Sequence, residues 1–185
     1  MRNVIYAINM SLDGCVDHSK LDGNDEIHEY YAQLMQDIDL LVFGRKTYQL
    51  MVPFWPDVAK NHSGPTKAMN DFAQAFAAKK ILVFSQTLDT AEGENTRIVG
   101  TNLQEEILKL KQEEGKSILV GGVDVPSQLI KLGLIDEYLF VVQPSIVGEG
   151  RRLLDDVSLP EKLQLKRVES KIFESGAVAL RCLKQ

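Results

Sequence analysis

Runs of consecutive apolar residues alternate along the chain with stretches in which apolar residues recur every three or four positions. An uninterrupted run of branched or aromatic residues is typical of a strand covered on both faces. Runs that are wholly or largely of this kind lie at residues 4–10, 40–43, 81–84, 97–99, 118–120 and 137–142. They predict strands, and the first is expected to be central in a sheet because it is largely apolar on both parities.

Spacings of three and four positions predict helices between these strands. The helices are expected over residues 25–36, 66–77, 103–114 and 125–132. In the last of them Val125, Leu129 and Leu132 share one face, Pro126 lies in the first turn and Gly133 follows the end.

Residues 52–65 interrupt this alternation and are expected to be irregular, because they contain several prolines and Gly64. The segment also holds Trp55, the only tryptophan of the chain. Two interpretations stay open for it, a flap over a site and an ordinary surface loop.

Two final runs, at residues 163–173 and 177–183, flank a polar turn and predict an antiparallel hairpin. Alternation in the second run predicts that Val178, Leu180 and Cys182 face inward. Strands that alternate with helices and end in a hairpin predict an α/β fold. We expect three α/β/α layers around a mostly parallel sheet with a C-terminal antiparallel hairpin.

Composition narrows the class of protein. With 185 residues, 44% of them hydrophobic, the chain can form one globular domain, residues 1–185. A net charge of −5 and a pI near 5.3 argue against nucleic acid or an anionic membrane as a partner. The cysteines, Cys15 and Cys182, have no metal-binding spacing and indicate a reduced, cytoplasmic setting without a metal. Neither a secretory signal nor a membrane helix is expected.

The strongest chemical signal is the pair Gly121 and Gly122, which ends one predicted strand and precedes a predicted helix. Adjacent glycines there let the backbone approach a phosphate, and the free N–H groups of the helix favour an anion. The alternative is a tight turn that needs positive φ. The pair is not the GxGxxG fingerprint, because no third glycine follows at that spacing.

Three other strand ends carry similar turns. Gly44, Arg45 and Thr47 end the second strand, and a basic pair at a helix N-terminus is explained better by a bound phosphate than by the helix dipole. Ser85 and Gln86 end the third, where they either bind a phosphate or cap the turn. Residues 11–14 end the first. Because ligands collect at the carboxyl ends of parallel strands, we expect the four turns to converge on one site.

Acidic residues at the start of the first helix are a weaker signal. Asp25, Glu26 and Glu29 are favoured by the helix dipole whatever the function. His28, beside them, indicates a site more weakly still.

Together the turns resemble the dihydrofolate-reductase-like superfamily, and most closely the reductase domain of bacterial riboflavin-biosynthesis deaminase-reductases and its stand-alone relatives. The matching segments span nearly the whole chain. They are SLDG at 11–14, GRKTY at 44–48, FSQTL at 84–88, ILVGG at 118–122 and LIDEYLFVVQPSIVGEG at 134–150.

The resemblance implies an NADPH-dependent reductase that forms a homodimer. It implies that two turns hold the cofactor diphosphate through Gly44, Arg45, Thr47, Gly121, Gly122, Val123 and Val125. Asp124 lies in the second of these cofactor-binding turns. It further implies that Ser85 and Gln86 hold the 2′-phosphate with Arg45, that Ile8 contacts the nicotinamide, and that Asp13 and Gly14 lie on a loop that closes over the reactive ring.

The chain departs from the pattern in three places. Cys15 stands where riboflavin-type members commonly have lysine, and Val123 and Asp124 stand where dihydrofolate reductases often have arginine. A carboxylate at Asp124 would repel a 2′-phosphate, so NADH is not excluded as the cofactor. The pterin-binding carboxylate of dihydrofolate reductases has no match by count in the first helix.

The sequence therefore favours a reductase of a ribosylamino-pyrimidine or a similar small heterocycle. Asp13 is the expected polar group that orients the substrate or relays a proton. Two alternatives stay open: a dihydrofolate or pterin reductase, and an NADPH-binding protein without turnover whose residues 52–65 meet a partner.

Overall fold

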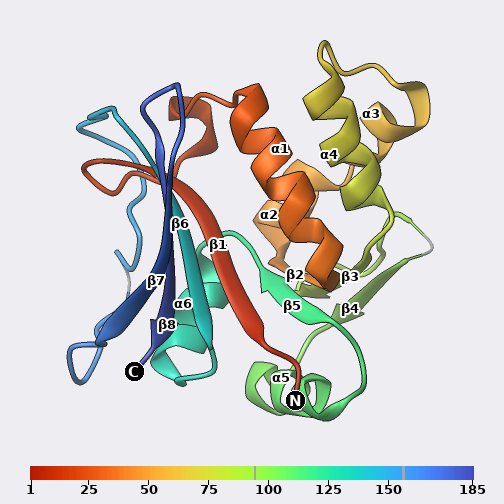
Figure 1. The fold of residues 1–185 in the computed structure, drawn as a ribbon. Helices are drawn as coiled ribbons and strands as arrows, with labels where there is room; N and C mark the ends of the chain where they lie inside the picture. Colours follow the sequence, from red (N-terminus) through yellow and green to blue (C-terminus); the bar gives the residue numbers. More distant parts are fainter. Residues whose placement is uncertain (94, 156) are drawn as a thin grey trace. The chain divides into compact units, whose positions relative to one another are not determined.

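The computed structural model describes residues 1–93, 95–155 and 157–185. Its strands are hydrogen-bonded in the order β4-β3-β2-β5-β1-β6-β8-β7 (Figure 1). The strands are β1 (Val4–Ser11), β2 (Ile38–Gly44), β3 (Lys80–Phe84), β4 (Thr96–Val99), β5 (Ser117–Val120), β6 (Glu137–Gln143), β7 (Leu165–Ile172) and β8 (Val178–Lys184). The longer helices are α1 (Asp25–Leu34), α2 (Arg45–Met51), α3 (Trp55–Asn61), α4 (Lys67–Ala77), α5 (Leu103–Gln112) and α6 (Asp124–Lys131). Single-turn helices lie at His18–Lys20 and Met35–Asp37.

Strand pairing confirms the predicted α/β class. The pairs β1–β6, β2–β3 and β3–β4 are parallel, whereas β6–β8 and β7–β8 are antiparallel. The sheet is thus mostly parallel and ends in the predicted C-terminal hairpin. Contacts within the chain group the residues into two compact units. The first unit is Met1–Arg2 with Gly23–Leu119, and the second is Asn3–Asp22 with Val120–Gln185.

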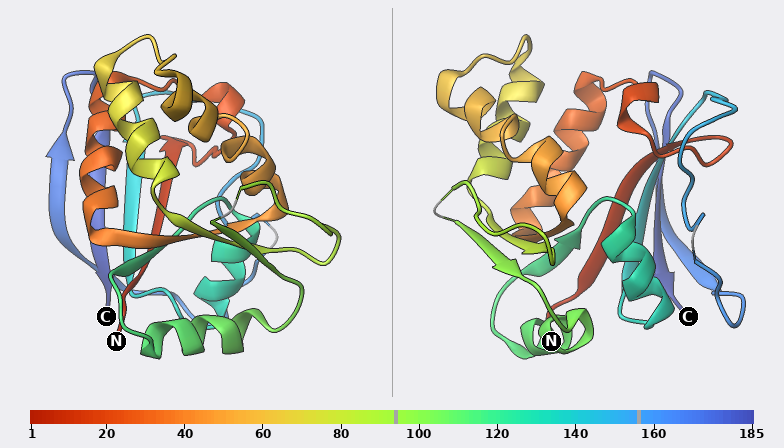
Figure 2. Two further views of the ribbon diagram at one scale, coloured as in Figure 1. Left: turned by 90° about the vertical axis from the view of Figure 1, so that its right-hand side faces the viewer. Right: turned by 180° about the vertical axis from the view of Figure 1, so that it is seen from behind.

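In the first unit, three helices pack together through apolar and aromatic side chains. Helix α4 contacts both α1 and α3, and its Phe72, Ala73 and Phe76 are buried, as their spacing predicts. Side-chain oxygens of the residues before two helices cap them: Asn24 accepts from the Ile27 N–H at 3.0 Å, and Thr66 accepts from the Met69 N–H at 3.2 Å. These helices can be followed in both views of Figure 2.

The prediction that residues 52–65 are irregular is wrong, because α3 occupies Trp55–Asn61. Its proline lies in the first turn, where a missing N–H leaves no hydrogen bond broken. Val58 and Ala59 are buried against Ala73, and burial of this apolar face stabilises the short helix. The helix ends at His62, whose φ of 48° is left-handed.

In the second unit, β6 lies between β1 and β8. Its Leu139 and Val141 are fully buried. Glu137 is also buried, and both of its oxygens accept from the guanidinium of Arg181 on β8, from Nε at 2.5 Å and from Nη2 at 3.2 Å. This bidentate pair fixes the register of the antiparallel strands, because a slip by one residue would leave a buried carboxylate without a partner.

Two details of the predicted apolar faces are wrong. In β8 the buried residue is Ala179, of the parity opposite to Val178, Leu180 and Cys182, which are only half-buried. Alternate residues of a strand point to opposite faces of the sheet, so Ala179 lies on the covered face of β8 and Val178, Leu180 and Cys182 lie on the other. In α6 the prediction fails at Leu132, which follows the last helical residue and is exposed.

Candidate functional site

The turns of the first unit lie at one edge of its parallel strands. Gly44, the last residue of β2, is the register partner of Phe84, the last residue of β3. The turn that begins at Arg45 and the turn at Ser85 therefore follow neighbouring strands at their carboxyl ends. The prediction that these two turns share an edge is confirmed within this unit.

The side chains of these two turns differ in how they are used. The Ser85 hydroxyl accepts from the N–H groups of Thr87 at 3.2 Å and Leu88 at 3.0 Å, as a turn cap does. Gln86 and Arg45 are exposed, and Arg45 Nη1 makes one long contact, 3.4 Å, with Gln49 Oε1. The structure thus shows the capping role of Ser85 and leaves the Arg45 guanidinium accessible to an anion. Thr47 is half-buried in the first turn of α2, whose N-cap, Gly44, has no side chain to cap it.

The Gly121–Gly122 turn, which belongs to the second unit, follows β5 in the chain and precedes α6. Gly122 has φ of +83°, a conformation that other residues rarely adopt, and its carbonyl oxygen accepts from the Tyr6 hydroxyl at 3.0 Å. Val123, the N-cap of α6, makes no side-chain cap hydrogen bond, and Val125 is buried. The first turn of α6 therefore receives no capping side chain from its own N-cap residue.

Asp124, at the start of α6, forms an ion pair with Arg151, whose Nη2 lies 2.5 Å from Asp124 Oδ1. The repulsion expected between Asp124 and a phosphate assumes that no cation lies beside the carboxylate. The guanidinium offsets that charge and places a cation beside the glycine turn.

Asp13 is the most heavily hydrogen-bonded of the predicted site residues. Its carboxylate accepts from the Ser11 hydroxyl at 2.6 Å, from the Val147 N–H at 3.1 Å and from the Gly148 N–H at 2.9 Å. Arg152 Nη2 lies 3.5 Å away. The Ser11 hydroxyl and the two backbone N–H groups hold the pKa of Asp13 far below its ordinary value. The carboxylate is therefore ionised at neutral pH and ties two loops together.

The loop after β1 is joined to residues 145–153 by further hydrogen bonds. The Leu12 N–H donates to the Ser145 carbonyl at 2.8 Å, and the Val16 N–H donates to the Arg151 carbonyl at 2.8 Å. Lys20 and Glu149 form an ion pair at 2.9 Å. Gly14, at φ +79°, lies in this loop, while Ile8 lies on β1 opposite Phe140. The predicted loop is confirmed for residues 12–14, whereas Ser11 still belongs to β1. The closure of this loop over a ring stays a prediction.

Two groups of residues were missed by sequence reasoning. Arg151 and Arg152 lie next to the GEG segment, and their ion pairs with Asp124 and Asp13 follow only from the fold. The second is His28, which the sequence indicates only weakly. In the structure its Nδ1 atom is buried and has no hydrogen-bond partner among the described residues.

No group of three or more His, Cys, Asp or Glu side chains suited to a metal ion occurs in residues 1–93, 95–155 and 157–185. None of the helices described over those same ranges has the length and apolarity needed to cross a membrane.

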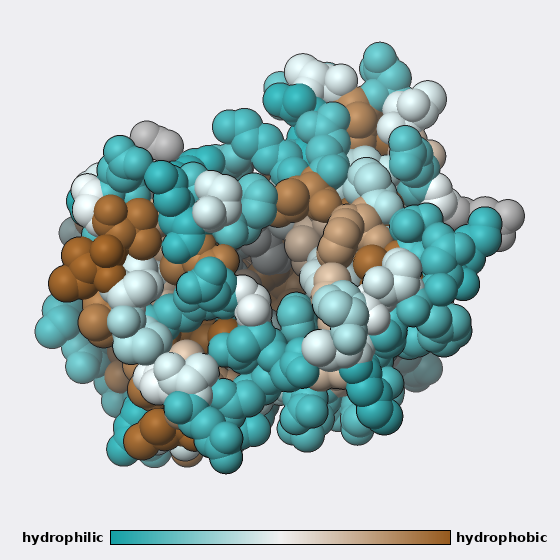
Figure 3. Space-filling model, turned by 90° about the horizontal axis from the view of Figure 1, so that it is seen from above, coloured by the Kyte–Doolittle hydropathy of each residue, from teal (hydrophilic) through white to brown (hydrophobic). Residues whose placement is uncertain are grey.

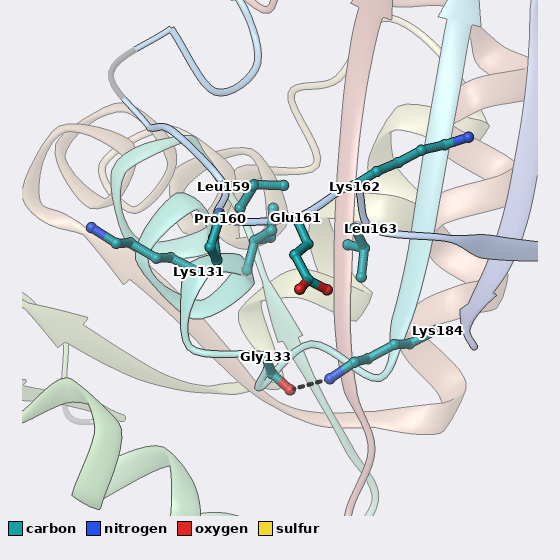
Figure 4. Close-up of a pocket in the computed structure, with 9 residues that line it drawn as sticks. Lys131, Gly133, Leu159, Pro160, Glu161, Lys162, Leu163 and Lys184 are labelled. Atoms are coloured by element: carbon teal, nitrogen blue, oxygen red, sulfur yellow. Dashed lines mark hydrogen bonds between the residues drawn. The ribbon is translucent and has the colours of Figure 1, made fainter.

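A cavity of about 280 Å³ in the second unit is lined by Lys131, Lys162, Lys184, Glu161 and apolar neighbours (Figure 4). It contains none of the predicted site residues, and Lys184 is engaged there with the Gly133 carbonyl at 3.0 Å.

Comparison with known proteins agrees with this geometry. The uncharacterized protein YyaP of Bacillus subtilis (strain 168) is 30% identical over 183 residues, which cover 97% of this chain and 93% of YyaP. A crystal structure described as a putative riboflavin biosynthesis protein from Shewanella sp. PV-4 has a TM-score of 0.74 at 21% identity, over 100% of this chain and 99% of that one.

Dihydrofolate reductase from Enterococcus faecalis, in complex with NADP(H), has a TM-score of 0.65 at 14% identity, over 99% of this chain and 96% of its own. These structural likenesses establish a fold of the dihydrofolate-reductase type. The family model of the RibD C-terminal domain matches residues 2–179. The chain therefore belongs to the RibD C-terminal domain family.

Proposed function

We propose that the protein is an NADPH-dependent reductase of the riboflavin-biosynthesis type, which transfers a hydride to a ribosylamino-pyrimidine or a similar small heterocycle. The observation that carries the proposal is the family match over residues 2–179, since it includes all four predicted turns. The accessible Arg45, the positive φ of Gly122 and the charge compensation of Asp124 support it.

Each unit by itself offers groups that fit a phosphate of a dinucleotide. The start of α6 offers backbone N–H groups behind a glycine turn, and anions are favoured at such a helix end. In the first unit, Arg45 and Gln86 project from neighbouring strand ends and would hold the 2′-phosphate, since a guanidinium binds phosphate bidentately. Ile8 would contact the nicotinamide from β1.

The protein's contribution to hydride transfer is to position the reactants and to exclude water. When bound, NADPH supplies the hydride. Asp13 holds the loop after β1 against residues 147–148 and so fixes one wall of the site. Because Asp13 is ionised at neutral pH, we assign it the orienting role among the two predicted for it, rather than the release of a proton.

We also propose a homodimer. Strand β7 is the last strand of the order and is almost wholly exposed, with apolar Val168 and Ile172 among its exposed residues. An exposed edge strand is a site for pairing with another chain. Sedimentation of the purified protein at two concentrations tests this proposal.

The reductase proposal is tested by following NADPH oxidation with 5-amino-6-(5-phosphoribosylamino)uracil and, in parallel, with dihydrofolate. Turnover of the pyrimidine alone supports the riboflavin type, and turnover of dihydrofolate alone supports the pterin alternative. NADPH binding without turnover of either would leave a cofactor-binding protein in place of the proposed enzyme.

A further inference from the structure

Tyr6 is a fully buried tyrosine whose hydroxyl group reaches the glycine turn. The residue lies on β1 and has 0% of its surface exposed. Its hydroxyl donates to the carbonyl oxygen of Gly122 at 3.0 Å, across 116 positions of the chain. Both residues belong to the second unit. The hydrogen bond therefore ties a strand to the turn before α6 within one compact unit.

Packing explains the ring of Tyr6 but not its hydroxyl group. The ring contacts Phe140 on β6 edge to face, with 5.9 Å between the centroids, an arrangement that aromatic pairs favour. Phenylalanine would keep this contact. Burial of a hydroxyl group is unfavourable unless it has a hydrogen-bond partner, and the partner here is the backbone of the turn. The hydroxyl group thus points to a role at Gly122.

The bond from Tyr6 fixes the direction of a backbone N–H group at the start of α6. The carbonyl group of Gly122 and the N–H group of Val123 belong to one planar trans peptide, so they point in opposite directions. Because the carbonyl is held by Tyr6, the Val123 N–H points away from the tyrosine hydroxyl. Glycine permits this turn, since the φ of Gly122 is +83°.

The start of α6 offers few but well-defined donors. The helix begins at Asp124 after Val123, which supplies no side-chain cap. The first N–H groups of a helix have no acceptor within it, and Pro126 in the first turn has no N–H group. The N–H groups of Val123, Asp124 and Val125 are therefore the donors that this helix start can offer to an anion.

The charges beside the turn are compatible with a phosphate. The Asp124 carboxylate is paired with the Arg151 guanidinium, which offsets its repulsion of an anion. On the face of the molecule seen from above, hydrophobic side chains occur as separate groups among hydrophilic ones (Figure 3). Such a face favours recognition through polar groups over burial against one continuous apolar patch.

We infer that Tyr6 is a positioning residue of the cofactor-binding turn. This inference rests on the proposed function, which supplies the ligand, a reduced nicotinamide dinucleotide. Tyr6 acts through the Gly122 carbonyl: it holds the peptide that carries the Val123 N–H in one orientation before the phosphate arrives. The turn then loses little conformational freedom on binding, and preorganisation of this kind raises affinity.

Three substitutions separate a positioning role from a structural one. Tyr6→Phe removes the hydroxyl group and keeps the ring. Tyr138→Phe is the matched control, because Tyr138 is the register partner of Tyr6 on β6, is 2% exposed and also contacts the Phe140 ring, at 6.0 Å. Gly122→Ala disturbs the turn directly, since alanine is strained at a φ of +83°.

For Tyr6→Phe we expect NADPH to bind about three- to tenfold more weakly, because the turn is no longer held. In the ligand-free variant the ¹⁵N order parameters of Gly122 and Val123 should fall from about 0.85 towards about 0.6. Tyr138→Phe should change neither quantity. A merely structural role would lower the melting temperature and leave the affinity unchanged, because the folded protein stays in large excess.

A double-mutant cycle shows whether Tyr6 acts through the turn. Added to Gly122→Ala, Tyr6→Phe should weaken NADPH binding less than about twofold further, because the orientation that Tyr6 protects is already lost. Losses that add in full would show that Tyr6 acts elsewhere and would overturn the inference.

Calorimetry with NADPH and with inorganic pyrophosphate keeps the inference separate from the reductase proposal. If NADPH binds wild type, its affinity decides: weaker binding to Tyr6→Phe supports the positioning role, whereas equal binding overturns that role and leaves the proposed function standing. If NADPH does not bind wild type, the proposed function falls and pyrophosphate decides: weaker binding to Tyr6→Phe supports the positioning role, and equal binding overturns it. If neither probe binds wild type, both proposals fall.

Discussion

Asp13, in the loop after β1, and His28, on α1, are polar residues of different units, and they differ in their hydrogen-bond partners. Asp13 accepts from a hydroxyl and from two backbone N–H groups, whereas His28 Nδ1 has no partner among the described residues. A group whose hydrogen-bonding capacity is used within the protein holds the structure together. A buried group left without a partner adds no such tie, so its replacement should cost the fold little.

From the sequence alone, Asp13 is a stronger candidate for a functional residue than His28. The hydrogen bonds in the structure do not follow that ranking. Asp13 follows a strand end and precedes a glycine, so it has the pattern of a catalytic loop residue. His28 is flanked by acidic residues that the helix dipole explains. Only the packing of α3 and α4 around α1 shows that the histidine ring is enclosed by Trp55 and Phe72.

If partnered groups are structural, the largest loss of stability should follow from breaking the pair of Glu137 and Arg181. Replacing Arg181 by Met leaves a buried carboxylate without its bidentate partner, and we expect a loss of about 3 kcal/mol in the free energy of unfolding, measured in urea. The double variant Glu137→Met with Arg181→Met should recover most of the loss. Equal stability of Arg181→Met and wild type would contradict the structural role of this pair.

A smaller and more local effect is expected at Asp13. Asp13→Ala should speed amide hydrogen exchange at Val147 and Gly148 roughly tenfold, because both N–H groups lose their acceptor. Asp13→Asn, which keeps one acceptor oxygen, should show less of this effect. Protection unchanged in Asp13→Ala would show that the loops are held by other contacts.

Asp13 also predicts a pH dependence. Its folded-state pKa lies below the unfolded value of about 3.9, so its contribution is present above about pH 4 and is lost as the pH falls through the folded-state pKa. Wild type should therefore lose stability below about pH 4 more steeply than Asp13→Asn does. Thermal unfolding between about pH 2 and pH 6 measures the difference, and parallel curves would contradict it.

Arg45 is an exposed residue whose guanidinium makes one long contact, with Gln49. Under the proposed function, Arg45→Gln should weaken NADPH binding about tenfold and leave NADH binding unchanged, because only NADPH carries the 2′-phosphate. Lys46→Gln, the neighbouring exposed cation, serves as the control. Equal losses for both nucleotides would place Arg45 away from the 2′-phosphate.

The smallest effect is expected at Arg151, whose guanidinium is already used by Asp124. Arg151→Met leaves the Asp124 carboxylate uncompensated beside the Gly121–Gly122 turn, and NADPH affinity should fall roughly threefold. In the double variant with Asp124→Asn the affinity should return. Calorimetry with each variant measures both values.

The fold was predictable because its strands are continuous apolar runs and its helices have regular spacing. The errors have specific causes. Helix α3 was missed because several prolines and Gly64 predict an irregular segment, although Pro56 lies in the first turn of the helix. The parity of β8 was missed because Ala179, small and buried, gives little signal in a hydrophobic pattern.

The site was predictable in part. Gly44 and Ser85 belong to turns with local signatures, and strand register places them together. The pairing of Asp124 with Arg151 joins residues far apart in the sequence, and the missing partner of His28 Nδ1 is a property of its surroundings. Neither can be read from local sequence.

The central claim, that this member of the RibD C-terminal domain family binds a reduced nicotinamide dinucleotide for catalysis, is tested most directly by titration with NADPH and NADH in parallel. Calorimetry gives both affinities, and Trp55, the only tryptophan, gives an independent optical signal. The account predicts saturable binding with a preference for NADPH that disappears in Arg45→Gln. If neither NADPH nor NADH binds, the glycine turns are only structural, and this result would contradict the account.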